Sequence, residues 1–167
     1  MALPPYLRPD CLRCAALCCV APPFDAEQGF GHDKAAGEPC RHLQQDNRCA
    51  VHASLIASGY PGCAAFDCYG AGQRVTLKYG NDAWRQSVDA AAAMFKSYSR
   101  MRALHELLAM VAVAKQQASM DAVSLRLQEV LAGLEQLCEI ESPVDVVALR
   151  QRTVREIRDA LSIQGSA

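Results

Sequence analysis

This sequence of 167 residues lacks an excess of charge of either sign, and it lacks a long apolar run. Lys and Arg number 17 against 18 Asp and Glu. The residues up to Gly80 hold 7 of each, and the rest hold 10 basic against 11 acidic residues. This balance argues against a nucleic-acid-binding surface. Because no apolar run approaches the roughly 20 residues that span a bilayer, we expect no membrane insertion.

The sequence also lacks the features of a signal peptide. Its first letters, MALPPYLRPDCLRC, place prolines and charges where an uninterrupted apolar stretch would be needed. We therefore expect a cytoplasmic protein. Stable disulfides are rare in that reducing compartment, so disulfide pairing explains the nine cysteines poorly.

The two halves of the chain differ in composition. Residues 1–80 hold eight of the nine cysteines and seven of the eight prolines, whereas residues 81–167 are rich in Ala, Leu, Val, Glu and Arg. A segment with so little apolar surface usually needs a metal or disulfides to stay folded. We expect a mainly α protein in two domains, an irregular metal-stapled cysteine-rich module (1–80) followed by a three-helix antiparallel bundle (81–167).

The first helix of the bundle is expected to begin after the N-cap pair Asn81-Asp82 and to run to about Ala114. Its apolar residues recur at spacings of three and four, which places them on one face. They are Met94, Tyr98, Met101, His105, Leu108 and Ala112. Further apolar residues on the first two helices would bury either against the cysteine module or against a second copy of the chain, as in a homo-oligomer. They include Leu104, Leu107, Val111 and Leu131.

The second helix is expected to start at Ser119 or Asp121, and the third at Ser142 with Pro143 at its first helical position. Each again has an apolar stripe. In the second helix it comprises Val123, Leu127, Val130, Leu134 and Leu137, and in the third Val147, Val154, Ile157 and Leu161.

Eight cysteines form the candidate metal-binding set, and no catalytic triad or paired carboxylates stand out beside them. The eight are Cys11, Cys14, Cys18, Cys19, Cys40, Cys49, Cys63 and Cys68. The C-x2-C spacing of Cys11 and Cys14 lets both sulfurs point into one tetrahedral site. Eight thiolates equal two four-coordinate sites, or one four-cysteine cluster plus one structural site. Free or buried thiols are the alternative explanation.

The vicinal pair Cys18-Cys19 bears on how the eight could be divided. On a helical turn Cys18 would share the face of Cys14, four residues earlier, whereas Cys19 would point elsewhere. The pair therefore fits two neighbouring sites or a cluster. All-thiolate sites suit zinc and iron–sulfur chemistry alike; we favour zinc, because paired spacings among turns resemble closed structural sites.

Several segments resemble a known family. The order C-x2-C-x3-C-C of Cys11 to Cys19, followed by the later cysteines up to Cys68, resembles the bacterial CxxCxxCC family, described as zinc- or iron-chelating. A closer resemblance is to the cysteine-rich segment before the repeats of some pentapeptide-repeat proteins, although no such repeats follow here. The stretches that carry it are DCLRCAALCCVAPPF, DKAAGEPCRHL, DNRCAVH, GCAAFDCYGAGQ and, in the first long helix, MRALHELL. A similar pattern in flagellin lysine methylases, described as iron–sulfur proteins, implies iron as the alternative metal.

Other polar residues have simpler explanations. His32, His42 and His52 lie among the cysteines, but we interpret them as hydrogen-bonding groups around the sites rather than as ligands. The ninth cysteine, Cys138, lies on the apolar side of the second helix, which indicates a core residue. We expect Asp46 and Asp67 to cap turns, with Gly70 and Gly72 in a tight turn after Cys68.

These features predict a metal-binding protein rather than an enzyme, whose module holds two structural zinc sites and supports a surface for a protein partner. Two alternatives stay open. One is an iron–sulfur redox or enzyme component, with Cys11, Cys14, Cys18 and Cys19 holding a cluster. The weaker one is metal storage or trafficking.

Overall fold

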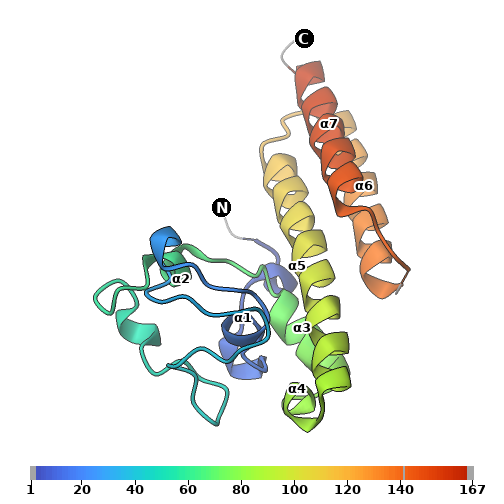
Figure 1. Cartoon of the computed structure of the whole chain (residues 1–167). Helices are drawn as coiled ribbons and strands as arrows, with labels where there is room; N and C mark the ends of the chain where they lie inside the picture. The colour runs from blue at the N-terminus through green and yellow to red at the C-terminus, as the bar shows by residue number, and fades with distance from the viewer. Residues whose placement is uncertain (1–2, 141, 165–167) are drawn as a thin grey trace. The chain divides into compact units, whose positions relative to one another are not determined.

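A computed structural model describes residues 3–140 and 142–164, and this part of the chain is mainly helical (Figure 1). By compactness the chain divides into two units. One runs from Pro9 to Ser99, and the other joins the N-terminal residues up to Arg8 to the chain from Arg100 onward. The division expected after residue 80 therefore differs from this one, because the helix α5 (Val88–Gln116) contributes residues to both units.

The C-terminal unit is a three-helix bundle of the last part of α5, α6 (Asp121–Glu139) and α7 (Val146–Gln164). Successive helices run antiparallel (Figure 1). Side-chain contacts follow this order: Arg100 Nη2 donates to the Leu137 carbonyl at 2.5 Å, and Lys115 donates to Gln128 nearer the α5–α6 connection.

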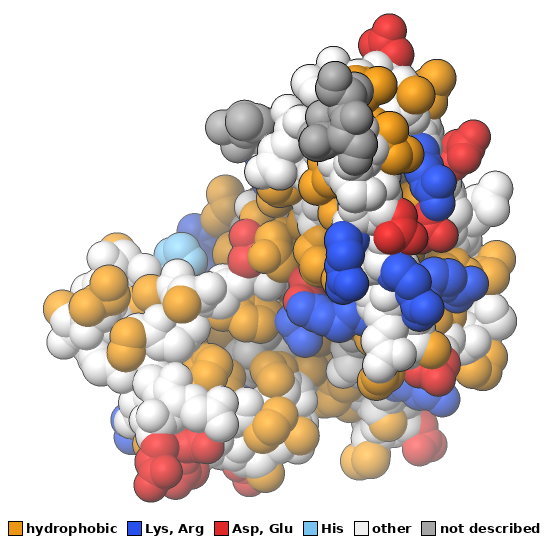
Figure 2. Space-filling model, turned by 90° about the horizontal axis from the view of Figure 1, so that it is seen from above, with side chains coloured by type: hydrophobic (Ala, Val, Ile, Leu, Met, Phe, Trp, Pro, Cys, Tyr) orange, Lys and Arg blue, Asp and Glu red, His pale blue; other side chains and the backbone are white. Residues whose placement is uncertain are grey.

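Exposed ion pairs link α7 to its neighbours. Arg126 Nη2 on α6 lies 2.9 Å from Glu156 Oε2 on α7, and Arg150 Nη1 on α7 lies 2.6 Å from Glu106 Oε1 on α5. Such pairs contribute little stability at the surface. Basic and acidic side chains accordingly lie beside one another on the face shown in Figure 2.

The apolar stripe predicted on the first helix is confirmed. Its six residues, Met94, Tyr98, Met101, His105, Leu108 and Ala112, are all buried. The helix start differs: a short helix, α4 (Ala83–Gln86), follows Asn81-Asp82, and the chain is extended at Ser87. The Ser87 hydroxyl then accepts the Ala90 N–H at 3.1 Å, which makes Ser87 the N-cap of α5.

The four further apolar residues were expected to bury either against the cysteine module or against a second copy of the chain. They are buried within the single chain. These are Leu104, Leu107, Val111 and Leu131. On α6 the buried stripe is Val123, Leu127, Leu131, Leu134 and Cys138. It confirms three of the five predicted positions and the core role of Cys138, while Val130 and Leu137 are half-buried.

The start predicted for the third helix was wrong by several residues. Helix α7 begins at Val146, and the Asp145 carboxylate accepts the Ala148 N–H at 3.0 Å, so Asp145 rather than Ser142 is the N-cap. The placement of Val147 on the apolar stripe of this helix was also wrong, because Val147 is 68% exposed. The buried residues of α7 are Leu149, Thr153 and Ala160.

The unit from Pro9 to Ser99 consists of loops and short helices. In the part the structure describes, extended chain is limited to two isolated bridges, Phe24 with Lys34 and Leu43 with Cys49. The short elements are η2 (Cys11–Arg13), α1 (Leu17–Val20), η3 (Ala26–Gln28), η4 (His52–Ser54), α2 (Pro61–Ala65), α3 (Ala71–Tyr79) and α4.

Helix α3 is the support for the first cysteine-bearing loop. The Ala15 N–H donates to Thr76 Oγ1 at 2.9 Å, and the Asp10 N–H donates to Gln73 Oε1 at 2.7 Å. Trp84 on α4 adds a third bond, from its Nε1 to the Ala15 carbonyl at 3.0 Å. The loop that carries Cys11 and Cys14 is thus hydrogen-bonded to α3 through the N–H groups of Asp10 and Ala15, and to α4 through the Ala15 carbonyl.

Within the described residues, none of the helices combines the length and the apolar character needed to cross a bilayer.

Replacing Asp145 with Ala should remove the α7 N-cap and lower the free energy of unfolding by about 1 kcal/mol. Ser142→Ala is the matched control, because Ser142 lies before the helix and its change should stay within about 0.5 kcal/mol. Urea unfolding followed by circular dichroism measures both. Equal losses from the two variants would contradict the assignment of the cap.

Candidate metal centre

All eight cysteines of the predicted set line three cavities within the unit from Pro9 to Ser99. The ninth, Cys138, lies in the other unit. A cavity of about 160 Å³ is lined by seven of the eight: Cys11, Cys18, Cys19, Cys40, Cys49, Cys63 and Cys68. Cys11 and Cys18 line all three cavities. The structure therefore gathers residues up to 57 positions apart in sequence around Cys18.

The smallest cavity, about 20 Å³, lies against α3. Its cysteines are Cys11, Cys14, Cys18 and Cys68. Gly72 brings the α3 backbone close to two of them: a Cβ at this glycine would lie 2.6 Å from Cys14 Sγ and 4.0 Å from Cys68 Sγ. The 2.6 Å distance is too short for a Cβ, so only glycine lets α3 approach Cys14 Sγ so closely, whereas the contact with Cys68 Sγ is an ordinary one.

Cys40 and Cys49 stand at the two ends of a hairpin-like loop on the opposite side of Cys18. The Cys40 N–H donates to the Cys19 carbonyl at 2.9 Å, which ties this loop to α1. The Leu43–Cys49 bridge closes the loop. Its tip is a turn in which the Asp46 carboxylate accepts the Arg48 N–H at 3.0 Å and Asn47 adopts a left-handed conformation (φ 65°).

Burial and mutual proximity raise the pKa of most of these thiols. Burial raises the pKa of Cys14 and of Cys63 to about 11 each. The pKa of Cys18 is raised well above its usual range, first by its contact with Cys19 and then by burial. Burial also raises the pKa of Cys11, Cys49 and Cys68. Thiolates in these cavities are therefore costly without a nearby cation.

Backbone amides partly offset this cost at three of the sulfurs. The N–H of Leu17 acts on Cys14, that of Val51 on Cys49, and those of Gly70 and Gly72 on Cys68, and each bond lowers the pKa of its thiol. A hydrogen bond to sulfur favours the thiolate, which is the form that binds metals.

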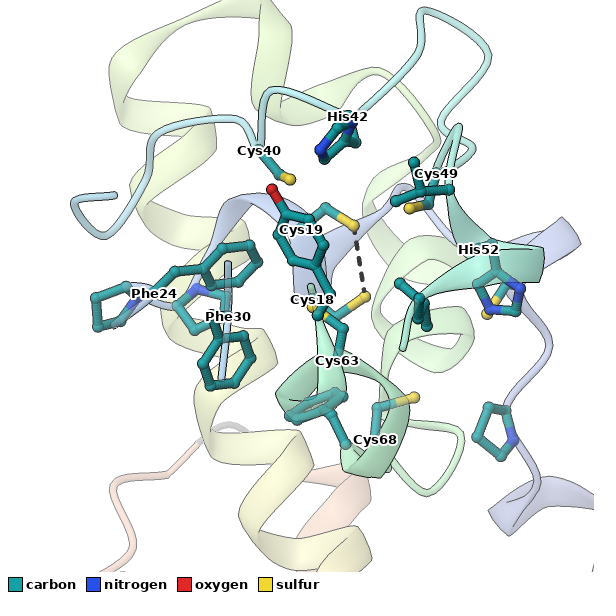
Figure 3. A pocket seen from close by; sticks show the side chains of 18 residues that line it. Cys18, Cys19, Phe24, Phe30, Cys40, His42, Cys49, His52, Cys63 and Cys68 are labelled. Carbon is teal, nitrogen blue, oxygen red and sulfur yellow. Dashed lines mark hydrogen bonds between the residues drawn. The ribbon is translucent and has the colours of Figure 1, made fainter. Parts of the chain in front are cut away.

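The donor set fits a thiophilic metal, but the side chains do not surround a common point in the structure. Among residues 3–140 and 142–164, no three His, Cys, Asp or Glu side chains are placed to hold one ion. The sulfurs of Cys18 and Cys19 face each other at 3.9 Å (Figure 3). Four sulfurs around one zinc lie about 3.8 Å apart, given 2.3 Å bonds in a tetrahedron. Binding would therefore require rotation of several cysteine side chains about χ1.

An aromatic cluster borders the cavity of about 160 Å³ (Figure 3) and was not predicted from the sequence. Phe24 stacks on Phe30 with ring centroids 4.9 Å apart, and the edges of His32 and His42 meet the buried Tyr60. No local pattern signals this cluster, because its members come from separate loops.

Tyr60 bonds both Arg41 and His32. Arg41 Nε donates to the Tyr60 hydroxyl at 3.1 Å, and His32 Nδ1 lies 3.0 Å from the same oxygen. Burial, followed by the charge of Arg41, lowers the pKa of His32. This agrees with the interpretation of His32 as a hydrogen-bonding group; His42 and His52 line the cavity of about 160 Å³.

Lys34 is a second feature that the sequence did not indicate. It is only 8% exposed, and its Nζ donates to the Val20, Pro22 and Ala35 carbonyls at 3.3, 2.5 and 3.3 Å. The same Nζ lies 4.6 Å from the Phe24 ring centroid. A buried ammonium with three carbonyl acceptors holds the chain that leaves α1, although burial still lowers its pKa.

The two aspartates cap turns as predicted. The Asp67 carboxylate accepts the Tyr69 N–H at 2.6 Å, as Asp46 does for Arg48. Gly70 adopts a left-handed conformation (φ 76°) before α3, which confirms the tight turn.

Comparison with known proteins finds a relative of this chain but no matching family model. The chain is 43% identical over 103 residues to an uncharacterized protein, YybG, of Bacillus subtilis (strain 168). No family model and no solved structure matches. The match covers 61% of this chain but only 37% of YybG, so the chain spans well under half the length of this relative. The resemblance to the CxxCxxCC family stays a prediction.

Gly72→Ala should destabilise the protein by about 1–3 kcal/mol, because the added methyl group would overlap Cys14 Sγ and force it to move. Gly133→Ala is the matched control in an open helical position of α6. It should stabilise the protein by about 0.5–1 kcal/mol. Chemical denaturation measures both changes, and a stabilising Gly72→Ala would refute the close approach of α3 to Cys14.

Proposed function

We propose that the unit from Pro9 to Ser99 is a metal-binding module in which the eight cysteines from Cys11 to Cys68 are the ligands and zinc is the metal. The observation that carries this proposal is the convergence of all eight cysteines on three cavities that share Cys11 and Cys18. The metal would supply the positive charge that buried thiolates require and would cross-link loops that have few backbone bonds to one another. The relative YybG adds no function, since it is itself uncharacterized.

The chemistry of the site favours metal over free thiols. Core cysteines are normally scattered among apolar neighbours, as Cys138 is on α6. Several of the other eight instead lie close enough to raise one another's pKa: Cys18 alone acts on Cys11, Cys14, Cys49, Cys63 and Cys68. Without a cation these thiols stay protonated and neutral, whereas a bound cation would favour their thiolate form.

The biological role that we propose is structural. A metal-stapled module would give the chain a rigid surface for a protein partner in the cytoplasm, where thiols stay reduced and available to zinc. Closed sites of four thiolates leave no open position for a substrate, so we assign no catalytic step to the module.

An iron–sulfur cluster is the second candidate, and the cavity lined by seven cysteines favours it. Its volume of about 160 Å³ and its seven cysteines offer more space and more ligands than one zinc ion needs. Four thiolates are the usual ligands of such a cluster. The protein would then serve as a redox or enzyme component.

Metal analysis of the anaerobically purified protein separates the two candidates. We expect a colourless protein with about two equivalents of zinc, since closed thiolate sites hold zinc tightly. A brown protein that contains iron and labile sulfide would contradict zinc and support the iron–sulfur cluster. A protein with neither metal, even after incubation with zinc under reducing conditions, would refute the proposed function.

Replacing Cys40 with Ser should lower the metal content and unfold the cysteine-rich unit, because metal binding and folding are coupled in such segments. Far-ultraviolet circular dichroism should retain most of its helical signal from α5, α6 and α7. Cys138→Ser is the matched control and should leave the metal content unchanged. Loss of metal from the control, or full retention by Cys40→Ser, would show that the ligand set is wrong.

A further inference from the structure

Cys18 and Cys19 form a pair of thiols that is already assembled. Their sulfurs lie 3.9 Å apart, and both cysteines are free and half-buried. Two sulfurs joined to one atom by bonds of about 2.3 Å, the zinc–sulfur length, are at most about 4.6 Å apart. The pair is therefore within the span of one soft atom. Because the two residues are adjacent in the chain, they stay together whether or not the more distant cysteines move.

The backbone around the pair is held on both sides. The Cys19 N–H donates to the Ala16 carbonyl at 2.8 Å, and the Cys19 carbonyl accepts the Cys40 N–H at 2.9 Å. Ala16 is buried in a left-handed conformation (φ 57°), which is rare for alanine. After the pair, Lys34 Nζ donates to the Val20 carbonyl at 3.3 Å. A ligand that joins thiols on an ordered backbone pays less conformational entropy.

Both thiols line the cavity of about 160 Å³, and Figure 3 shows them there with Phe24 and Phe30. Apart from cysteines, two histidines and Tyr60, the lining is apolar; it includes Pro22, Phe24, Phe30, Leu55 and Phe66. An apolar cavity of about 150 Å³ is large enough to bind benzene. An uncharged group of the size of a phenyl ring therefore has room beside the two sulfurs.

The number of thiols and the apolar walls narrow the class of ligand. A zinc ion takes four ligands, whereas within residues 3–140 and 142–164 no three His, Cys, Asp or Glu side chains are placed to hold one ion. A trivalent organoarsenical needs only two thiols, because the third bond of its arsenic is to carbon. The resulting dithiolate is uncharged, so apolar walls surround it without the cost of a buried charge.

We propose that Cys18 and Cys19 form a binding site for a trivalent aryl arsenical, whose aromatic group lies in the cavity beside Phe24 and Phe30. With an arsine oxide, two S–H bonds and the As=O bond break, two As–S bonds form and one water leaves. Arsenic stays trivalent, and no oxidant is consumed. The site goes beyond the proposed function and does not depend on it, because it needs no other cysteine. Metal and arsenical would compete, since both thiols are also proposed metal ligands.

Titration of the full-length protein with phenylarsine oxide, in an excess of a monothiol reductant, tests the thiol pair. Intact mass spectrometry should show a first equivalent that adds one phenylarsenic group with the loss of two thiol hydrogens. Cys19→Ser should weaken this binding at least roughly tenfold, since the second bond is no longer intramolecular. Cys14→Ser is the control, because Cys14 is the other candidate partner of Cys18. An unaffected Cys19→Ser, or an equal loss in Cys14→Ser, would overturn the site.

A second pair of variants tests the aromatic part of the site. Phe30→Ala removes a half-buried ring from the cavity wall and should weaken binding of phenylarsine oxide by roughly tenfold. Binding of methylarsine oxide should stay unchanged, because its methyl group covers little of the wall. Phe95→Ala, which removes a half-buried ring outside this lining, should behave as the wild type. Equal weakening of both arsenicals by Phe30→Ala would refute the aryl pocket, and this test holds even if Cys19→Ser does not fold.

Zinc binding separates this inference from the proposed function. A protein that binds zinc through thiolates but shows none of these preferences for phenylarsine oxide refutes the arsenical site alone. A protein that binds no zinc but takes up one phenylarsenic group at Cys18 and Cys19 refutes the proposed function alone. If both proposals are correct, one equivalent of phenylarsine oxide should release zinc from the loaded protein, and Cys138→Ser should respond as the wild type does.

Discussion

The crowding of thiol groups around Cys18 is the constraint on which the cysteine-rich unit depends. Cys18 lines all three cavities, and its sulfur lies 3.9 Å from that of Cys19. Buried thiols so close together cannot all ionise unless a cation is present. The fold of this unit and its proposed function thus have the same cause: loops that bring these sulfurs together are stabilised by whatever neutralises them.

The loops around the cavities are positioned by side chains that are not ligands. Thr76 and Trp84 hold the peptide groups of Ala15, Gly72 admits the sulfur of Cys14, and Lys34 binds the carbonyls that follow α1. These contacts account for a compact unit with little regular structure. Metal binding as proposed would in addition require rotation of cysteine side chains, since no three His, Cys, Asp or Glu of the described residues are placed to hold one ion.

The sequence predicts the helices well where burial follows a helical period. The stripe from Met94 to Ala112 is buried throughout. Helix starts were less predictable, because several residues near each start can act as the N-cap. Asn81-Asp82 and Ser142 are as suitable by residue type as Ser87 and Asp145, which cap the helices in the structure. Tertiary packing decides between them. In the cysteine-rich unit the spacing singles out eight thiols, and the structure gathers all eight at three cavities. Which loop meets α3, and contacts such as those of Lys34 and Tyr60, could not be predicted, because no local pattern encodes them.

Zinc K-edge X-ray absorption of the full-length protein, loaded with two equivalents of zinc, tests the central claim most directly. Eight cysteine ligands for two ions predict a first shell of about four sulfur atoms per zinc at roughly 2.3 Å, without nitrogen or oxygen neighbours. A shell with nitrogen at roughly 2.0–2.1 Å would show that histidines such as His42 or His52 replace cysteines. A shell of oxygen alone would contradict thiolate binding altogether.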